Sequence, residues 1–268
     1  MQRLGRTMMV TGALAVSACG AMEPAQPTFG VPGGLAQSLG PGWVDAPLPD
    51  TKLGPGAIVQ ITPVGKDEID LRWLGSLAGS CQVPSSALTV TKGGVGQVRT
   101  DREYSIGVQA AASVAKVGAE VGAKGARSAQ LTVKKASADA LDLIRFRSWL
   151  AVPTNAAGID TRCGSTLREP NVYVVQEAFV VSDGSFTFLN DAGVKVGVTP
   201  PPTVPVKIGL DASGKSNGDL VITQPIVFAI HRMQQAKDGS FRTLGQESAE
   251  VDANSVLAGK RIRNVSGL

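Results

Sequence analysis

Apolar residues alternate with polar or small residues along most of the chain after Ala57, which is the pattern of strands that lay one face on a core. The clearest runs cover residues 58–64, 70–74, 87–91, 171–181 and 220–230. Asp183-Gly184 separates two such runs, and this dipeptide is a strong signal for a tight hairpin turn. The pattern predicts a mainly β fold over residues 57–268: an antiparallel sandwich or barrel-like domain with one or two short helices.

Two segments predict the short helices. In residues 137–149, Ser137 can cap a short helix or turn, and we expect a strand from Leu141 to Val152 after it. Ser248–Leu257 is the second candidate for a short helix.

Residues 104–134 leave three interpretations open. Alternation is regular from Tyr104 to Val114, and its phase reverses near Lys116. The segment can form consecutive strands of the sheet. It can instead form an Ala/Gly-rich helix over 110–124, with Lys116, Glu120 and Lys124 four residues apart. Runs of about 9–11 alternating residues also match transmembrane strands, and here the segment loosely resembles the membrane-inserting hairpins of pore-forming proteins. Its candidate membrane- or partner-contact face is Val114, Val117 and Val121.

The N-terminus has the features of an export signal. Arg3 and Arg6 precede an uncharged, largely apolar run over residues 8–18, which is too short to span a bilayer. The run ends in Val16-Ser17-Ala18-Cys19, which resembles the lipobox of bacterial lipoproteins. The resemblance implies cleavage of a signal peptide of residues 1–18 and attachment of acyl chains to Cys19. It also implies a protein anchored in the bacterial outer membrane, facing the periplasm or the cell surface. Residues 19–56 are rich in Pro and Gly, and we expect them to form the lipid anchor and a tether, in which Trp43 and Leu48 can still dock on the folded domain.

Export to an oxidising compartment would allow the other two cysteines to form a disulfide. Cys81 and Cys163 are an even pair, and we predict a disulfide between them. Two buried free thiols are the alternative.

The stretch from Gly209 to Ser216 matches the spacing of a phosphate-binding loop, with Gly209, Gly214, Lys215 and Ser216 at the motif positions. Such a loop must open a helix, but Asn217-Gly218-Asp219 follows, and these are turn residues. We therefore interpret the match as chance and predict a polar loop that joins two strands of a hairpin.

Little else in the sequence indicates catalysis. The chain has one histidine, His231, which we expect to be a strand residue with a satisfied hydrogen bond. Acid pairs such as Asp139 and Asp142 carry no local signature of glycoside hydrolysis. The net charge of +4 is spread without a long basic run, so we expect no nucleic-acid partner. We expect no cofactor, metal or nucleotide.

These observations favour a non-enzymatic envelope lipoprotein that serves as a binding or scaffold module. Its partner would be an envelope protein, a glycan or another copy of the chain. A membrane-perforating effector that uses residues 104–134 is the alternative, and a periplasmic hydrolase ranks third.

The lipid anchor gives the first prediction. Cys19→Ala should leave a precursor that is neither lipidated nor cleaved, because the thiol is the acceptor of the acyl chains. Mass spectrometry of the N-terminus and membrane fractionation measure this outcome. Normal membrane fractionation of the variant would contradict the anchor.

Overall fold

The computed structural model describes residues 35–40, 42–48, 51–63, 68–93, 103–244 and 261–266. The predicted signal peptide, Cys19 and the predicted helix at 248–257 lie outside these residues. The strands are β1 (Trp43–Leu48), β2 (Ala57–Pro63), β3 (Glu68–Ser76), β4 (Val90–Gly93), β5 (Glu103–Ile106), β6 (Ser128–Leu141), β7 (Val172–Leu189), β8 (Lys195–Val196), β9 (Val206–Leu210), β10 (Ser216–Ile222), β11 (Ile226–Gln235), β12 (Phe241–Thr243) and β13 (Arg261–Ser266). The helices are α1 (Leu35–Leu39), η1 (Thr51–Leu53), α2 (Val108–Ala115), α3 (Gly118–Ala123), α4 (Leu143–Leu150), α5 (Pro153–Ile159), the π-helical turn η2 (Asp160–Gly164) and α6 (Ser165–Leu167).

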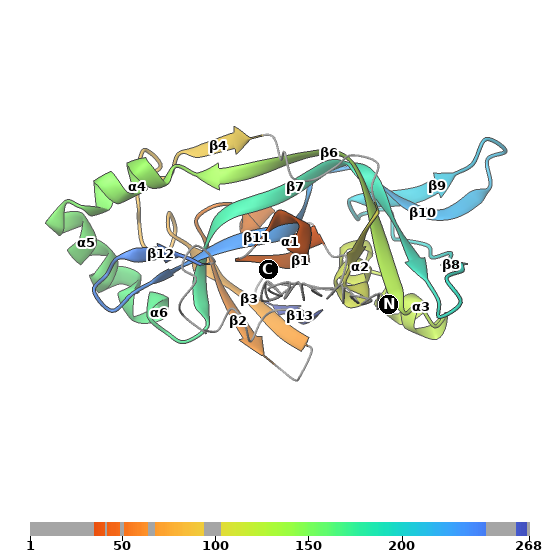
Figure 1. Ribbon diagram of the computed structural model, residues 1–268, viewed down its shortest axis with the longest axis horizontal. Helices are drawn as coiled ribbons and strands as arrows, with labels where there is room; N and C mark the ends of the chain where they lie inside the picture. Colours follow the sequence, from red (N-terminus) through yellow and green to blue (C-terminus); the bar gives the residue numbers. More distant parts are fainter. Residues whose placement is uncertain are drawn as a thin grey trace, which may run out of the picture.

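The prediction of a mainly β, antiparallel fold is confirmed. Within the described residues thirteen strands join one sheet, and its pairs are antiparallel except for β13, which runs parallel to β3. The sheet does not close into a barrel. Short helices gather at its two ends: α4, α5 and α6 at one end, and α2 and α3 at the other (Figure 1).

The long strand β7 is the centre of the sheet. β6 pairs with it from Ser128↔Leu189 to Ala140↔Glu177, and β2 continues along the same strand at its first residues. On the other side β7 pairs with β11 and then with β10. Figure 1 shows β6 and β7 running side by side across most of the molecule.

The predicted turn at Asp183-Gly184 is wrong, because β7 passes through it without reversing. The ladder with β6 has its irregularities here, between Val133 and Lys135 and between Lys135 and Ala136. A Cβ atom on Gly184 would overlap the carbonyl oxygen of Thr132 in the facing strand. Glycine therefore permits close approach of two backbones at a bulge, and continuous pairing to β6 outweighs the local turn preference.

The order of elements predicted for 137–149 is also wrong. Residues up to Leu141 belong to β6, and the helix α4 follows. Asp142, not Ser137, is its N-cap: the carboxylate accepts a hydrogen bond from the Arg145 amide at 3.0 Å. The strand comes first because β7 offers it a partner as far as Ala140.

Two further strands differ from prediction in their extent. Residues 87–89 precede β4, which begins at Val90. Residues 220–230 divide into β10 and β11, and Pro225 lies in the break between them. Proline cannot donate to a ladder, so a break there agrees with its chemistry.

The apolar side chains form three buried clusters. The first lies between α1, α2, α3 and one face of β5, β6, β7, β9, β10 and β11. The second is built on β1, β2, β3, β7 and β11, and the third lies under α4, α5 and α6. Along β7, Val172 and Val174 enter the third cluster while Tyr173 and Val175 enter the second, as a pleated strand requires.

The predicted tether at 19–56 is too long. Leu35, Leu39, Trp43 and Leu53 are buried in the core, and β1 pairs with β11. The folded domain therefore includes residues well before Ala57, because these scattered apolar side chains find a surface that the alternation of residues could not show.

Gly184→Ala tests the close approach of β6 and β7. We expect a loss of about 1–3 kcal/mol in the free energy of unfolding, the usual cost of overpacking a tight site. Gly122→Ala is the control, since nothing lies near a Cβ there, and it should be neutral or slightly stabilising. Urea unfolding measures both, and equal stabilities for the two variants would refute the packing argument.

Candidate functional site

The segment between β5 and β6 folds as two short helices. This outcome matches the helical interpretation for residues 108–123 and the strand interpretation for the flanks. α2 ends at Ala115, and its C-cap residue Lys116 has left-handed backbone angles, φ 53° and ψ 38°. Neither α2 nor α3 has a side-chain cap at its N-terminus. Packing rather than capping therefore holds these helices.

Val114, Val117 and Val121 do not form an exposed contact face in this structure. All three are buried in the first cluster, at 0%, 4% and 2% exposure. Ala111, Ala112 and Ala115 of α2 lie in the same cluster. The helical period turns these side chains inward together, which a strand with the same sequence could not do.

Glu120 of α3 and Lys124, the C-cap residue of that helix, hold α3 to the segment that follows β8. Lys124 Nζ donates to the Gly197 carbonyl at 2.6 Å and to Glu120 Oε1 at 2.7 Å. Glu120 Oε2 accepts from the Thr199 amide at 3.0 Å. The hydrogen bond from Lys124, followed by that from Thr199, lowers the pKa of Glu120. The predicted i,i+4 pair of Glu120 and Lys124 is thus present, and it also reaches across to another segment.

A second group of polar residues surrounds His231 in β11. The imidazole stacks on Trp43 of β1 with 5.3 Å between ring centroids, and Nε2 lies 2.9 Å from the Leu244 carbonyl oxygen. Nε2 therefore carries the hydrogen and donates it. Nδ1 lies 3.8 Å from Glu177 Oε2. Burial lowers the pKa of His231 and raises the pKa of Glu177. The prediction of a hydrogen-bonded strand histidine is confirmed.

Asp45 and Arg232 are the other charged groups of this region. Asp45 Oδ1 accepts from the Ala36 amide at 2.9 Å, so the side chain joins β1 to α1. Burial raises the pKa of Asp45 from 3.8 to about 6. The guanidinium of Arg232 lies 4.7 Å from the Tyr173 ring centroid, and its burial lowers the pKa to about 10. Sequence reasoning missed Asp45 because its Pro/Gly-rich surroundings indicated a tether; the adjacent Trp43-Val44 pair was the signal for a buried strand.

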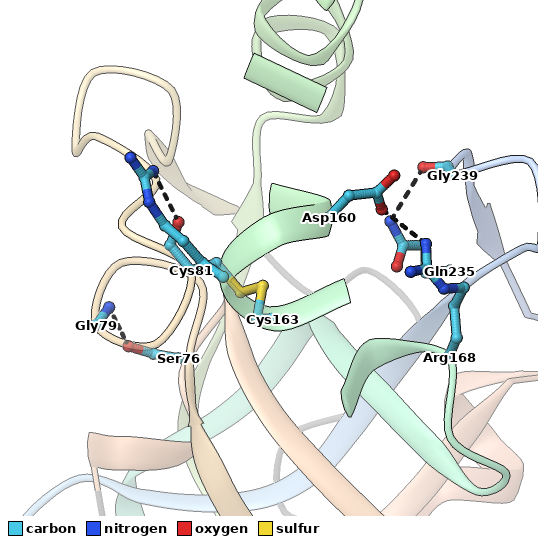
Figure 2. The surroundings of a disulfide bond; sticks show 9 residues. Ser76, Gly79, Cys81, Asp160, Cys163, Arg168, Gln235 and Gly239 are labelled. Atoms are coloured by element: carbon cyan, nitrogen blue, oxygen red, sulfur yellow. Dashed lines mark hydrogen bonds and ion pairs between the residues drawn. A yellow bond between two sulfur atoms is a disulfide. The ribbon is translucent and has the colours of Figure 1, made fainter. Parts of the chain in front are cut away.

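The predicted disulfide between Cys81 and Cys163 is confirmed. Figure 2 shows it joining the loop after β3 to the helical turn η2. Arg162, beside Cys163, donates to the Cys81 carbonyl at 3.5 Å, and Asp160 pairs with Arg168 at 2.7 Å. The bond therefore attaches the α4–α6 helices to the sheet across a separation of 82 residues.

The predicted hairpin is confirmed, since β9 and β10 pair antiparallel. Its turn is shorter than predicted, because Asn217, Gly218 and Asp219 already belong to β10. Asp211 accepts hydrogen bonds from the amides of Ser213 and Lys215 and closes the turn. Gly214 supplies the positive φ of 79° that the turn needs. No helix follows Ser216, so the geometry of a phosphate-binding loop does not form here.

The acid pair Asp139 and Asp142 has structural roles. Asp139 lies 3.9 Å from Lys92, and Asp142 caps α4. Within the described ranges, no group of three or more His, Cys, Asp or Glu side chains is placed to bind a metal ion. In the same part of the chain, no helix has the length and apolar character to cross a bilayer.

A cavity of about 380 Å³ lies between the α4–α5 helices and the turn that joins β11 to β12. Phe241 and Leu150 supply apolar walls, while Arg147, Asp160 and Asp238 add charge. Its volume is in the range of small-ligand sites.

Comparison with known proteins gives little further guidance. No family model matches the chain, and no curated protein matches it. Among solved structures, the chain is similar to a bacterial gasdermin from Bradyrhizobium tropiciagri, with 12% identity, a TM-score of 0.40, and coverage of 86% of this chain and 94% of that chain. A likeness of this size supports no conclusion about what this chain does.

Asp45 gives a pH-dependent prediction. Its folded pKa of about 6 is above the ordinary value of 3.8, so its contribution to stability is fully present below about pH 4. That contribution is lost as the pH rises through 6, because the folded state must then bury a charge. Asp45→Asn keeps the acceptor for Ala36 without the charge. Relative to wild type, the variant should gain about 1–3 kcal/mol in free energy of unfolding between pH 4 and pH 7.5.

Urea unfolding at several pH values measures this difference. Other titrating groups are common to both proteins and cancel. Parallel stability curves for wild type and variant would contradict a raised pKa of the Asp45 carboxyl.

Proposed function

We propose that this protein is a membrane-anchored effector that perforates lipid bilayers with a β-hairpin formed from residues 103–132. The observation that carries the proposal is the pairing of β5 with β6. In this structure α2 and α3 connect those two antiparallel neighbours. Perforation would require residues 107–127 to change from helix to strand and lengthen a hairpin whose base is already paired.

The register of the base predicts the partners of the lengthened hairpin. The observed pairs run from Glu103↔Thr132 to Ile106↔Ala129. Continued unchanged, this register sets Ala112 opposite Ala123 and Val114 opposite Val121. Even-numbered residues of the first arm then share a face with odd-numbered residues of the second. In this register the apolar residues must change from even to odd positions between the two arms. The sequence shows this change of phase near Lys116.

The two faces of such a hairpin would differ in polarity. One face carries Tyr104, Ile106, Val108, Ala112 and Val114 with Leu131, Ala129, Ala123 and Val121 of the second arm. The other carries Ser105, Gln109, Ser113, Gln130, Lys124 and Glu120, with glycine and alanine between them. Arg127, opposite Val108, is the exception on the apolar face. Its place near the base of the hairpin allows the long side chain to reach the membrane interface.

The arms of the hairpin are long enough to cross a bilayer, and its unpaired edges require more than one copy. Each arm from 107 to 115 and from 120 to 128 supplies about nine residues, the span of a transmembrane strand. A single hairpin would leave two unpaired strand edges in lipid, which is unfavourable because each unpaired amide lacks water. Several copies must therefore pair edge to edge, so we propose self-association. Acyl chains on Cys19 would concentrate the chain at the membrane and favour this assembly.

Ala123→Asp and Gly122→Asp form a matched pair of variants. Both positions are exposed in α3, so neither change disturbs the buried core. In the lengthened hairpin Ala123 lies on the apolar face and Gly122 on the polar face. Ala123→Asp should slow dye release from vesicles at least about tenfold, since a carboxylate in lipid costs up to about 3 kcal/mol per hairpin. Gly122→Asp should stay close to wild type.

Substitutions of Val114 or Val121 with Asp are poorer tests, because both side chains are buried and the folded protein itself would be destabilised. Urea unfolding checks that Ala123→Asp and Gly122→Asp fold equally well. Equal leakage by the two variants would reject the hairpin.

A binding or scaffold module of the envelope is the second candidate function. The observation in its favour is the cavity beside α4 and α5, whose walls are fixed to the sheet by the Cys81–Cys163 disulfide. This candidate requires that the wild-type chain release no dye from vesicles. The leakage assay therefore separates the two functions.

A further inference from the structure

Residues 35–40 and 42–48, which we call the strap, cover part of residues 107–127, the segment that must unfold in the proposed function. Leu35, Ala36 and Leu39 of α1 and Trp43 of β1 are buried in the same cluster as Val114 and Ala115 of α2. β1 also lies beside α2, and α1 lies beside β5. The strap thus supplies part of the apolar surface against which α2 packs.

A few specific contacts hold the strap in place. β1 pairs with β11 at Trp43↔His231, Val44↔Ile230 and Asp45↔Ala229, and the register becomes irregular before Leu48. The Trp43 ring stacks on His231, and the Gly42 carbonyl accepts from Arg232 Nε at 3.4 Å. Gly42 has a φ of +84°, and a side chain there would overlap the Leu244 carbonyl. The strap is therefore fitted to one place on β11.

The strap can leave without breaking the main sheet. Among the described strands β1 pairs with β11 alone, and β11 keeps its separate ladder with β7. α1 has five residues, which is too short to persist as a helix once detached.

α2 and α3 depend on such external packing. They are eight and six residues long, and neither has an N-terminal side-chain cap. Loss of the strap would uncover one side of α2, and helices this short do not persist without tertiary contacts.

We propose that the strap is an autoinhibitory element: its release from β11 and α2 precedes the unfolding of residues 107–127. The inference rests on the proposed function only in that release of the strap would permit perforation of a membrane. The coupling between strap and α2 is a property of the protein in solution and can be measured without lipid.

Trp43→Ala and Phe241→Ala are the matched variants for the solution test. Both aromatic side chains are buried, at 8% and 6% exposure, but Phe241 belongs to the third cluster, away from the strap. Hydrogen exchange of the full chain is followed by mass spectrometry, with the amides of β7 as internal reference. Trp43→Ala should speed exchange in residues 108–123 at least about tenfold relative to β7, through more frequent local opening. Phe241→Ala should leave that ratio unchanged.

A crosslinked strap supplies the converse test. Val44→Cys with Ile230→Cys places two thiols on directly opposed residues of β1 and β11, and the single variants are controls. The oxidised double variant should slow exchange in 108–123 and block dye release from vesicles of phosphatidylethanolamine and phosphatidylglycerol. Reductant should restore release. Wild type with and without reductant controls for the native disulfide.

The outcomes separate the two proposals. The autoinhibitory role of the strap is refuted if Trp43→Ala leaves hydrogen exchange of residues 108–123 unchanged. It is also refuted if Phe241→Ala accelerates that exchange equally. If the oxidised double variant releases dye at the same rate as the wild-type chain, the proposal is overturned as well. Faster exchange in Trp43→Ala without dye release from any variant upholds the strap as a cover of α2 and rejects perforation.

Discussion

The pairing of β6 with β7 is the constraint on which the other elements depend. β7 offers one edge to β6 and β2 and the other to β11, β10 and β8, so five strands take their position from it. The ladder tolerates a bulge opposite Gly184 because that residue lets the two backbones approach closely. It also fixes β6 as the strand from which β5 is aligned, and hence the register at the base of the α2–α3 segment.

Residues 107–127 carry two incompatible patterns. The alternation of apolar and polar residues is that of a hairpin, yet the segment forms helices. Packing on the first core cluster, the contacts of Glu120 and Lys124 with 197–199, and the strap together favour the helices. A segment whose sequence pattern favours a strand but which folds as a helix is expected where a protein adopts two conformations. This conflict connects the proposed perforation with the proposed role of the strap.

Sequence patterns predicted the features that depend on near neighbours or on simple chemistry. The hairpin of β9 and β10, the strands β2 and β3, and the pairing of Cys81 with Cys163 all followed from short motifs or from counting. The failures involve partners far apart in sequence. Asp183-Gly184 had the composition of a turn, residues 137–149 suited helix or strand, and Trp43 stood in a Pro/Gly-rich stretch. Each was decided by a distant strand: β6 pairs with Asp183 and Gly184, β7 pairs with the 137–149 segment as far as Ala140, and β11 pairs with Trp43.

The sequence by itself determined the mainly β class, the positions where strands can form and the chemistry that the chain carries. Alternation and turn residues are properties of the local backbone, so a single chain displays them. Only the tertiary structure decided that β7 continues through Asp183-Gly184, that α2 and α3 lie between β5 and β6, and that Leu35, Leu39 and Trp43 belong to the core. Burial of apolar surface and completion of long-range ladders outweigh local preferences of about 1 kcal/mol, and those gains exist only when distant segments meet.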